Sequence, residues 1–152
     1  MAGKCSVVMC MRSSLMAMNK NSGTVSTADV IATYKGKIVL IERLKFPYGL
    51  ALPGGHVERG EHPMHAAMRE FCEETGLMLL NARFVARHEG KHRDPRYAST
   101  RTRVYAGRAL GEVRNETGHT KVCVFSKAEL RKLPKERFAF DHHKILMCYL
   151  QS

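Results

Sequence analysis

The sequence contains no tryptophan, and aromatic residues make up only 7% of its 152 residues. Proteins that bind single-stranded nucleic acid rely on aromatic stacking, so this scarcity counts against that class. No apolar stretch is long enough to cross a membrane, and we expect no membrane-spanning segment. The five cysteines are scattered and odd in number, which argues against a disulfide framework and against zinc. The predicted location is therefore the reducing cytoplasm.

Acidic residues are also few, with 14 Asp and Glu against 25 Lys and Arg, which leaves a formal net charge of +11. Much of the basic excess falls in one segment, which we call the basic strip: Arg83, Arg87, Lys91, Arg93, Arg96, Arg101, Arg103 and Arg108. A basic surface attracts polyanions, so the predicted partners are RNA or a phosphorylated small molecule.

The length of the chain suits a single domain with a substantial core. Residues 1–23 hold five methionines and three basic residues but no acidic residue. That composition weakly resembles a mitochondrial presequence, but we predict a flexible N-terminal tail. The folded domain is predicted to run from residue 24 to residue 152.

Short apolar runs separated by turn residues and amphipathic segments predict an α/β fold. The predicted strands cover residues 30–32, 38–41, 78–80, 84–86, 100–107 and 122–125, with a polar turn at 89–96. Lys35 and Gly36 predict a hairpin turn between the first two strands. Predicted helices begin at Pro63, Lys127 and His142; a capping box of Ser126 and Glu129 opens the second, and Asp141 is expected to cap the third. His142 itself is predicted to be a surface residue.

Three carboxylates dominate the first predicted helix. Glu70, Glu73 and Glu74 lie three and four positions apart, which places them on one helical face. Like charges so close together repel unless a cation lies between them, and oxygen ligands favour Mg²⁺. The opposite arc, formed by Met64, Ala67, Met68, Phe71 and Thr75, is predicted to pack on the core. The sequence thus predicts a helix that is apolar behind and binds metal in front.

The stretch from Gly55 to Leu77 resembles the Nudix hydrolase signature, G-x5-E-x7-R-E-U-x-E-E-x-G-U, where U is a bulky apolar residue. The matching residues are Gly55, Glu61, Arg69, Glu70, Phe71, Glu73, Glu74, Gly76 and Leu77, without departure. The resemblance implies a Nudix-type α/β/α sandwich with a mixed β-sheet. It also implies hydrolysis of a pyrophosphate bond in a nucleoside diphosphate derivative, with Mg²⁺ as cofactor and Mn²⁺ as a substitute.

The same resemblance implies roles for individual residues. Glu70 and Glu74 would bind the metal directly, with Glu73 in the same site and the carbonyl of Gly55 completing it. Glu61 would support the site by hydrogen bonding, and Arg69 would hold the glutamates in place. The general base stays open between a glutamate of the signature, such as Glu73, and the loop residues Glu112 and Glu116.

Two segments are predicted to bind the substrate. Arg43 and Lys45 precede the signature and are placed to meet phosphate, and Tyr48 or Phe46 is placed to stack on a base. The triplet Asp94-Pro95-Arg96 resembles that of bacterial and archaeal ADP-ribose pyrophosphatases, which favours ADP-ribose or a related nucleotide sugar. A tight turn explains the Asp-Pro pair equally well.

Two other functions stay open at this point. One is a nucleoside triphosphate pyrophosphohydrolase, including one that acts on oxidised nucleotides. The other is a catalytically idle Nudix module that binds a nucleotide or RNA, although such modules commonly lose signature residues. A small nucleotide is the preferred partner over RNA, and a homodimer is kept as an alternative to a monomer.

Overall fold

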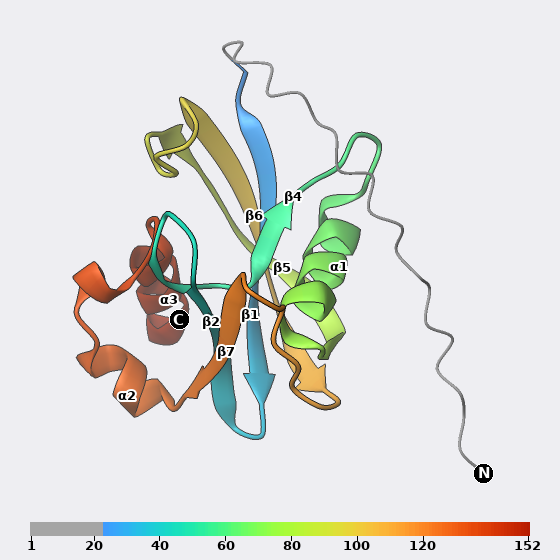
Figure 1. Cartoon of the computed structure of the whole chain (residues 1–152), viewed down its shortest axis with the longest axis vertical. Coiled ribbons are helices and arrows are strands. Elements are labelled where there is room, and N and C mark those ends of the chain that lie inside the picture. The colour runs from blue at the N-terminus through green and yellow to red at the C-terminus, as the bar shows by residue number, and fades with distance from the viewer. Residues whose placement is uncertain (1–22) are drawn as a thin grey trace.

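The computed structural model describes residues 23–152 (Figure 1). The predicted N-terminal tail lies outside this range except for its last residue. The strands are β1 (Val25–Tyr34), β2 (Lys37–Arg43), β3 (Gly49–Ala51), β4 (Gly54–His56), β5 (Met78–Lys91), β6 (Ser99–Leu110) and β7 (Thr120–Phe125). The helices are α1 (Pro63–Thr75), α2 (Lys127–Lys132) and α3 (His142–Gln151), with a 3-10 turn η1 at Lys135–Arg137.

The strands form one mixed sheet in the order β3-β2-β1-β6-β5, with β4 paired to β1 and β7 paired to β2. The β1–β6 pair is parallel and the other pairs are antiparallel. Helix α1 packs on one face of the sheet, and α2 and α3 cover the other (Figure 1). This arrangement is the predicted α/β/α sandwich.

The alternation of side chains along β1 divides the core into two layers. Ala28, Val30 and Ala32 pack with Phe71 of α1, whereas Ile31 belongs to the cluster that includes Ile145 of α3. Burial of apolar surface stabilises each layer by about 25 cal/mol per Å², and this free energy holds the helices on the two faces of the sheet. The sheet therefore fixes the position of α1, whose side chains form part of the site described below.

Most local predictions are confirmed. Lys35 and Gly36 form the hairpin turn with φ values of 49° and 77°, and Gly76 ends α1 in the left-handed conformation at φ 73°. Both bonds of the predicted capping box, between Ser126 and Glu129, are present.

Several local predictions are wrong. The predicted polar turn at 89–96 begins later, because β5 continues to Lys91 in register with Ser99 of β6. Met68 is 38% exposed, and Ala66 takes its predicted place in the core. His142 is buried rather than at the surface, with only 6% of its area exposed.

No helix within residues 23–152 has both the length and the apolarity needed to cross a bilayer.

Candidate active site

The three glutamates of α1 lie on one face but in different environments. The Glu74 carboxylate is buried, and its Oε2 accepts a hydrogen bond of 2.9 Å from the backbone N–H of Gly54. The side chain of Glu70 is 20% exposed and that of Glu73 is 42% exposed. The acidic face therefore runs from solvent at Glu73 to the interior at Glu74.

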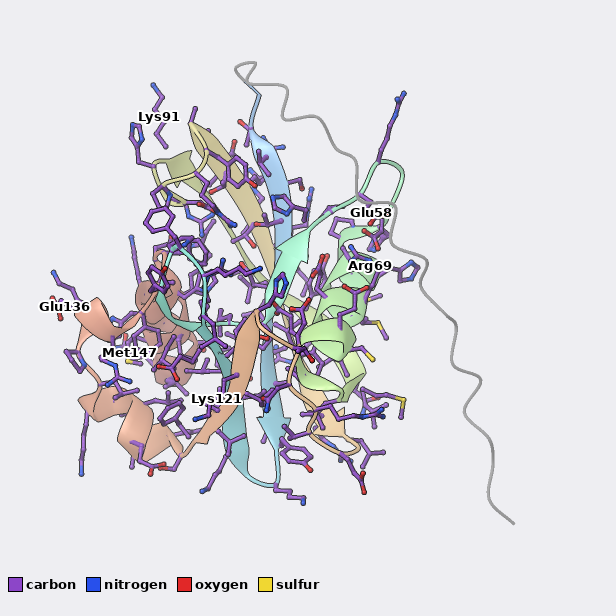
Figure 2. The ribbon with its side chains drawn as sticks, in the orientation of Figure 1. Glu58, Arg69, Lys91, Lys121, Glu136 and Met147 are labelled. Atoms are coloured by element: carbon purple, nitrogen blue, oxygen red, sulfur yellow. The ribbon has the colours of Figure 1, made fainter. Side chains whose placement is uncertain are left out.

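Arg69 neutralises much of this face and lies on α1 next to the loop that carries Glu58 (Figure 2). Its guanidinium donates to both carboxylate oxygens of Glu61, at 2.9 and 3.0 Å, and to Glu70 Oε1 at 2.8 Å. It also donates to the carbonyl of His56 at 3.1 Å and lies 3.6 Å from Glu73 Oε2. The bonds to Glu61 raise the pKa of Arg69 and lower the pKa of Glu61. Arg69 thus lies where the sequence predicts it, and Glu61 reaches the glutamates of α1 through it.

Two glycines of β4, Gly54 and Gly55, place the backbone directly against the acidic face. A Cβ placed on Gly55 would come within 2.4 Å of Glu70 Cδ, and one placed on Gly54 would come within 2.3 Å of the Ala28 carbonyl. Strand β4 is held in this position by antiparallel pairing with β1. Because any side chain at residue 55 would displace the Glu70 carboxylate, the close approach requires glycine.

The electrostatics of the acidic face suit a cation. Burial raises the pKa of Glu70 despite the bond from Arg69, with Glu73 and Glu116 adding to the rise. Burial also raises the pKa of Glu74 well above its ordinary value, against the bond from Gly54, with Glu70 and Glu116 contributing further. Ionised carboxylates that disfavour one another are stabilised by a positive charge placed among them.

In the part of the chain that the structure describes, no three His, Cys, Asp or Glu side chains are close enough to enclose a metal ion as they stand. Oε1 of Glu70 accepts a hydrogen bond of 2.8 Å from the Arg69 guanidinium. The donor set nevertheless fits a hard divalent ion, since it consists of carboxylate oxygens beside a close backbone. Because Arg69 bonds only Oε1 of Glu70, the other carboxylate oxygen could bind the ion.

The two loop candidates for the general base occupy different places between β6 and β7. Glu116 is half-buried, and its charge raises the pKa values of both Glu70 and Glu74. Glu112 is exposed and lies beside Gly76, just past the C-terminal end of α1. The structure therefore brings Glu116, rather than Glu112, into electrostatic contact with the acidic face.

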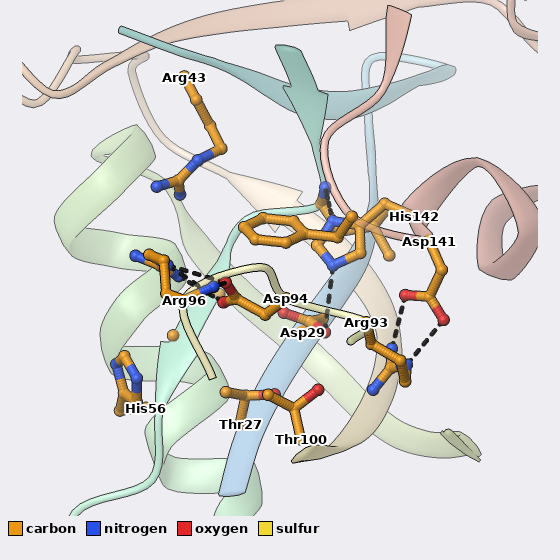
Figure 3. A pocket seen from close by; sticks show the side chains of 14 residues that line it. Thr27, Asp29, Arg43, His56, Arg93, Asp94, Arg96, Thr100, Asp141 and His142 are labelled. Carbon is orange, nitrogen blue, oxygen red and sulfur yellow. Dashed lines mark hydrogen bonds and ion pairs between the residues drawn. The ribbon is translucent and has the colours of Figure 1, made fainter. Parts of the chain in front are cut away.

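A cleft adjoins the acidic face and reaches from Gly54 and Gly55 to the start of α3 (Figure 3). Of the residues predicted to bind substrate, Arg43, Asp94 and Arg96 line it. The remaining two do not: Lys45 Nζ lies 3.2 Å from His119 Nε2, and Tyr48 is 68% exposed beside Phe46. Neither Lys45 nor Tyr48 lines the cleft.

Two guanidinium groups face the same aromatic ring in this cleft. Arg43 Cζ lies 5.1 Å from the centroid of Phe140, and Arg96 Cζ lies 5.7 Å from it. Burial and the charge of Arg96 lower the pKa of Arg43. Burial alone would raise the pKa of Asp94, but the bonds from Arg96 hold it below its usual range. The cleft is lined by three arginines and three aspartates, and the two guanidiniums beside Phe140 are the groups that could attract an anion.

Sequence reasoning missed the other polar residues of the cleft, above all Asp29 and His142. His142 Nδ1 accepts the backbone N–H of Leu52 at 2.9 Å, and its Nε2 lies 3.6 Å from Asp29 Oδ2. Asp141 makes no capping bond; instead it receives two bonds of 2.7 Å from Arg93. A sequence signal that could have indicated this cluster was Asp29, an acidic residue within an otherwise β-prone strand.

The burial of His142 gives a prediction about stability and pH. Burial lowers the pKa of His142 from its ordinary value of 6.5, so the unfolded chain binds more protons in that range. The stability associated with neutral His142 is fully present above pH 6.5 and is lost as the pH falls through the folded-state pKa. The Asn side chain in His142→Asn can still accept from Leu52 but does not titrate. We expect the loss of Tm between about pH 7 and pH 5 to be smaller in this variant by about 2–4 °C.

Thermal unfolding followed by circular dichroism measures this difference. His65→Asn, at an exposed position on α1, is the control and should follow the unmodified chain. A His142→Asn variant with the full acid sensitivity of the unmodified chain would contradict the prediction.

Comparison with known proteins places the chain among relatives. A family model described as NUDIX domain matches residues 24–147. An ADP-ribose pyrophosphatase of Methanocaldococcus jannaschii is 35% identical over 125 residues, which cover 81% of this chain and 71% of that protein. An 8-oxo-dGTP diphosphatase of Haemophilus influenzae is 40% identical over 65 residues, covering 41% of this chain and 48% of that protein.

Solved structures resemble the fold as well. The NUDIX domain of Shewanella oneidensis NrtR, in complex with ADP ribose, matches with a TM-score of 0.74 at 18% identity, covering 90% of this chain and 92% of that one. A MutT NUDIX hydrolase from Burkholderia pseudomallei matches with a TM-score of 0.64 at 24% identity, covering 74% of this chain and 88% of that one. These likenesses confirm the predicted sandwich.

Proposed function

Since this chain belongs to the Nudix family and is a hydrolase of phosphorus-containing anhydrides, we propose that it cleaves the diphosphate of ADP-ribose or a close nucleotide sugar. The observation that carries the proposal is the bonded pair of Asp94 and Arg96 in the cleft beside Gly54 and Gly55. A carboxylate at this place repels a terminal pyrophosphate, whereas it accepts hydrogen bonds from sugar hydroxyls. The similarity to the M. jannaschii ADP-ribose pyrophosphatase supports the same choice.

Nudix hydrolases generally use divalent metal ions, and we propose Mg²⁺ here, with Mn²⁺ able to replace it. Glu70, Glu73, Glu74 and the carbonyl of Gly55 would hold it. When bound, the ion would neutralise charge on the diphosphate and make water more acidic. Phosphoryl transfer depends mostly on such positioning and charge stabilisation.

The chain's own residues provide the rest. Arg43 and Arg96 would bind the diphosphate at the mouth of the cleft, where both guanidiniums are oriented by contact with Phe140. Glu116 is favoured as the group that takes the proton from the attacking water, because it alone of the two loop candidates acts on Glu70 and Glu74. Water adds to one phosphorus, the bridging P–O bond breaks, and the products are AMP and ribose 5-phosphate.

Part of the basic strip belongs to the cleft and to ion pairs within the domain. Three of its members are bonded to carboxylates: Arg93 to Asp141, Arg96 to Asp94 and Arg101 to Glu89. Two of the three, Arg93 and Arg96, line the cleft instead of forming an open basic surface.

A substrate panel with Mg²⁺ tests the function, with all products identified by ion-exchange chromatography and ³¹P NMR. We expect kcat/KM for ADP-ribose to exceed that for every nucleoside triphosphate tested, with AMP and ribose 5-phosphate in equal amounts. Pyrophosphate released from a triphosphate as the dominant product would instead support the second candidate, suggested by the 8-oxo-dGTP diphosphatase relative.

Arg96→Ala should weaken substrate binding more than it slows turnover. We expect KM for ADP-ribose to rise about tenfold and kcat to stay within about threefold, as when an interaction common to ground and transition states is lost. Arg101→Ala is the matched control, because it also removes an arginine bonded to a carboxylate, Glu89, but outside the cleft. Steady-state kinetics of both variants decide the matter, and equal KM values would refute the role of Arg96.

A further inference from the structure

One face of the sheet changes from apolar to polar beneath the cleft. Residues that face each other on the parallel strands β1 and β6 point to the same side. On this side Ile31 and Val104 belong to the apolar core, but the positions before them are Thr27 and Asp29 on β1 and Thr100 and Thr102 on β6. We call these four residues the polar floor; Thr27, Asp29 and Thr100 line the cleft (Figure 3).

Asp29 is held rigidly within the polar floor. It is 6% exposed, and its Oδ2 accepts a hydrogen bond of 2.5 Å from Thr102 Oγ1. On its other side a Cβ at Gly54 would come within 2.6 Å of Asp29 Oδ1, so glycine is needed there to leave room for the carboxylate. A buried carboxylate destabilises a fold unless its oxygens receive hydrogen bonds, and Thr102 supplies only one.

His142 places a donor next to this acceptor. Because Nδ1 accepts the Leu52 N–H, the proton of the neutral ring is on Nε2. Nε2 lies 3.6 Å from Asp29 Oδ2, which is too long for a hydrogen bond. His142 is 6% exposed and lines the same cleft. The structure therefore holds a fixed donor and a fixed acceptor side by side, both more than nine-tenths buried.

We propose that Asp29, the Nε2–H of His142 and the hydroxyl of Thr27 form a subsite that binds the hydroxyl groups of a ribose of the substrate. This inference rests on the proposed function and adds to Asp94 further residues that would distinguish a sugar from a phosphate. A vicinal diol both donates and accepts, so it matches the carboxylate and the imidazole N–H together. A phosphate has no proton to give Asp29 at neutral pH and is repelled by it.

The position of the subsite agrees with the rest of the cleft. Gly54 separates Asp29 from the acidic face, since its N–H donates to Glu74 while its Cα faces the Asp29 carboxylate. The guanidiniums of Arg43 and Arg96 lie at the mouth, beside Phe140. A diphosphate bound by these arginines next to Gly55 would place an attached ribose over the polar floor.

The test compares ADP-ribose with two analogues, each lacking the 2-hydroxyl of one ribose, as substrates of the full chain with Mg²⁺. For the unmodified chain we expect kcat/KM for one analogue to be roughly ten- to hundredfold lower than for ADP-ribose. This factor corresponds to the loss of one or two hydrogen bonds to a charged group. In Asp29→Asn that preference should fall to within about twofold, through a higher KM for ADP-ribose at nearly unchanged kcat. Thr27→Val and His142→Asn should show smaller losses of the same kind.

Thr33→Val is the matched control, since it lies on the same strand and the same face but outside the cleft. Circular dichroism establishes that each variant is folded, and Thr27→Val and His142→Asn decide the question if Asp29→Asn is not. Undiminished preference in the folded variants overturns the subsite while leaving the proposed function intact. Failure of the unmodified chain to cleave ADP-ribose overturns both.

Discussion

Chelation of divalent cations should reduce ADP-ribose hydrolysis to background, a loss of several orders of magnitude, and Mg²⁺ or Mn²⁺ should restore it. The physical reason is the acidic face of α1, where burial and neighbouring carboxylates raise the pKa values of Glu70 and Glu74. Without a cation these groups cannot all be ionised at low cost, and the diphosphate would meet an unneutralised negative surface.

Thermal unfolding gives a second measurement that is independent of activity. A carboxylate with a raised pKa contributes stability below its unfolded-state value of 4.5, and that stability is lost as the pH rises through the folded-state pKa. Added Mg²⁺ should therefore raise Tm at pH 8 and have little effect at pH 5, where protons compete for the carboxylates. Full turnover in excess chelator, together with a Tm indifferent to Mg²⁺, would exclude the metal site.

Glu74→Gln should lower kcat/KM by about a thousandfold without harming the fold. The amide oxygen of glutamine can still accept the N–H of Gly54, so the local geometry survives. The variant also removes a charge from a position that is 7% exposed. Because ionised Glu74 is disfavoured there, we expect the metal-free Tm to be unchanged or higher by a few degrees.

Loss of activity with gain of stability distinguishes a functional charge from a structural one. Glu70→Gln should show the same activity loss, whereas its Tm should fall slightly, since its bond from Arg69 at 2.8 Å is weakened. Glu136→Gln is the control, on the far side of the molecule from Arg69 (Figure 2). Near-normal kinetics of Glu74→Gln would show that this carboxylate is not needed for turnover.

The parts of the fold that the sequence predicts are those set by local spacing. The i, i+3 and i+4 pattern of α1, its end at Gly76 and the capping box of α2 each depend on residues within a few positions of one another. The same locality explains why the glutamates and Arg69 lie together as predicted.

The cleft could not be predicted from local spacing, because its residues come from segments that are far apart in the sequence. Asp29 and His142 are brought together by β1 and the start of α3, and nothing in either segment alone indicates the other. Arg43 and Arg96 were proposed separately, and only the fold shows that both face Phe140. Lys45 and Tyr48 were predicted from the same segment as Arg43, but only Arg43 lines the cleft.

The bonds of Arg69 have a consequence for how the protein handles metal. Its guanidinium reaches Glu61, Glu70 and, more weakly, Glu73, so the metal-free acidic face is already partly neutralised. An ion at the proposed metal site would share the Glu70 carboxylate with this group, and the nearby positive charge would lower the affinity for the ion. Arg69 would thus act as a counter-ion that belongs to the chain itself and that holds the glutamates in place when no metal ion is bound.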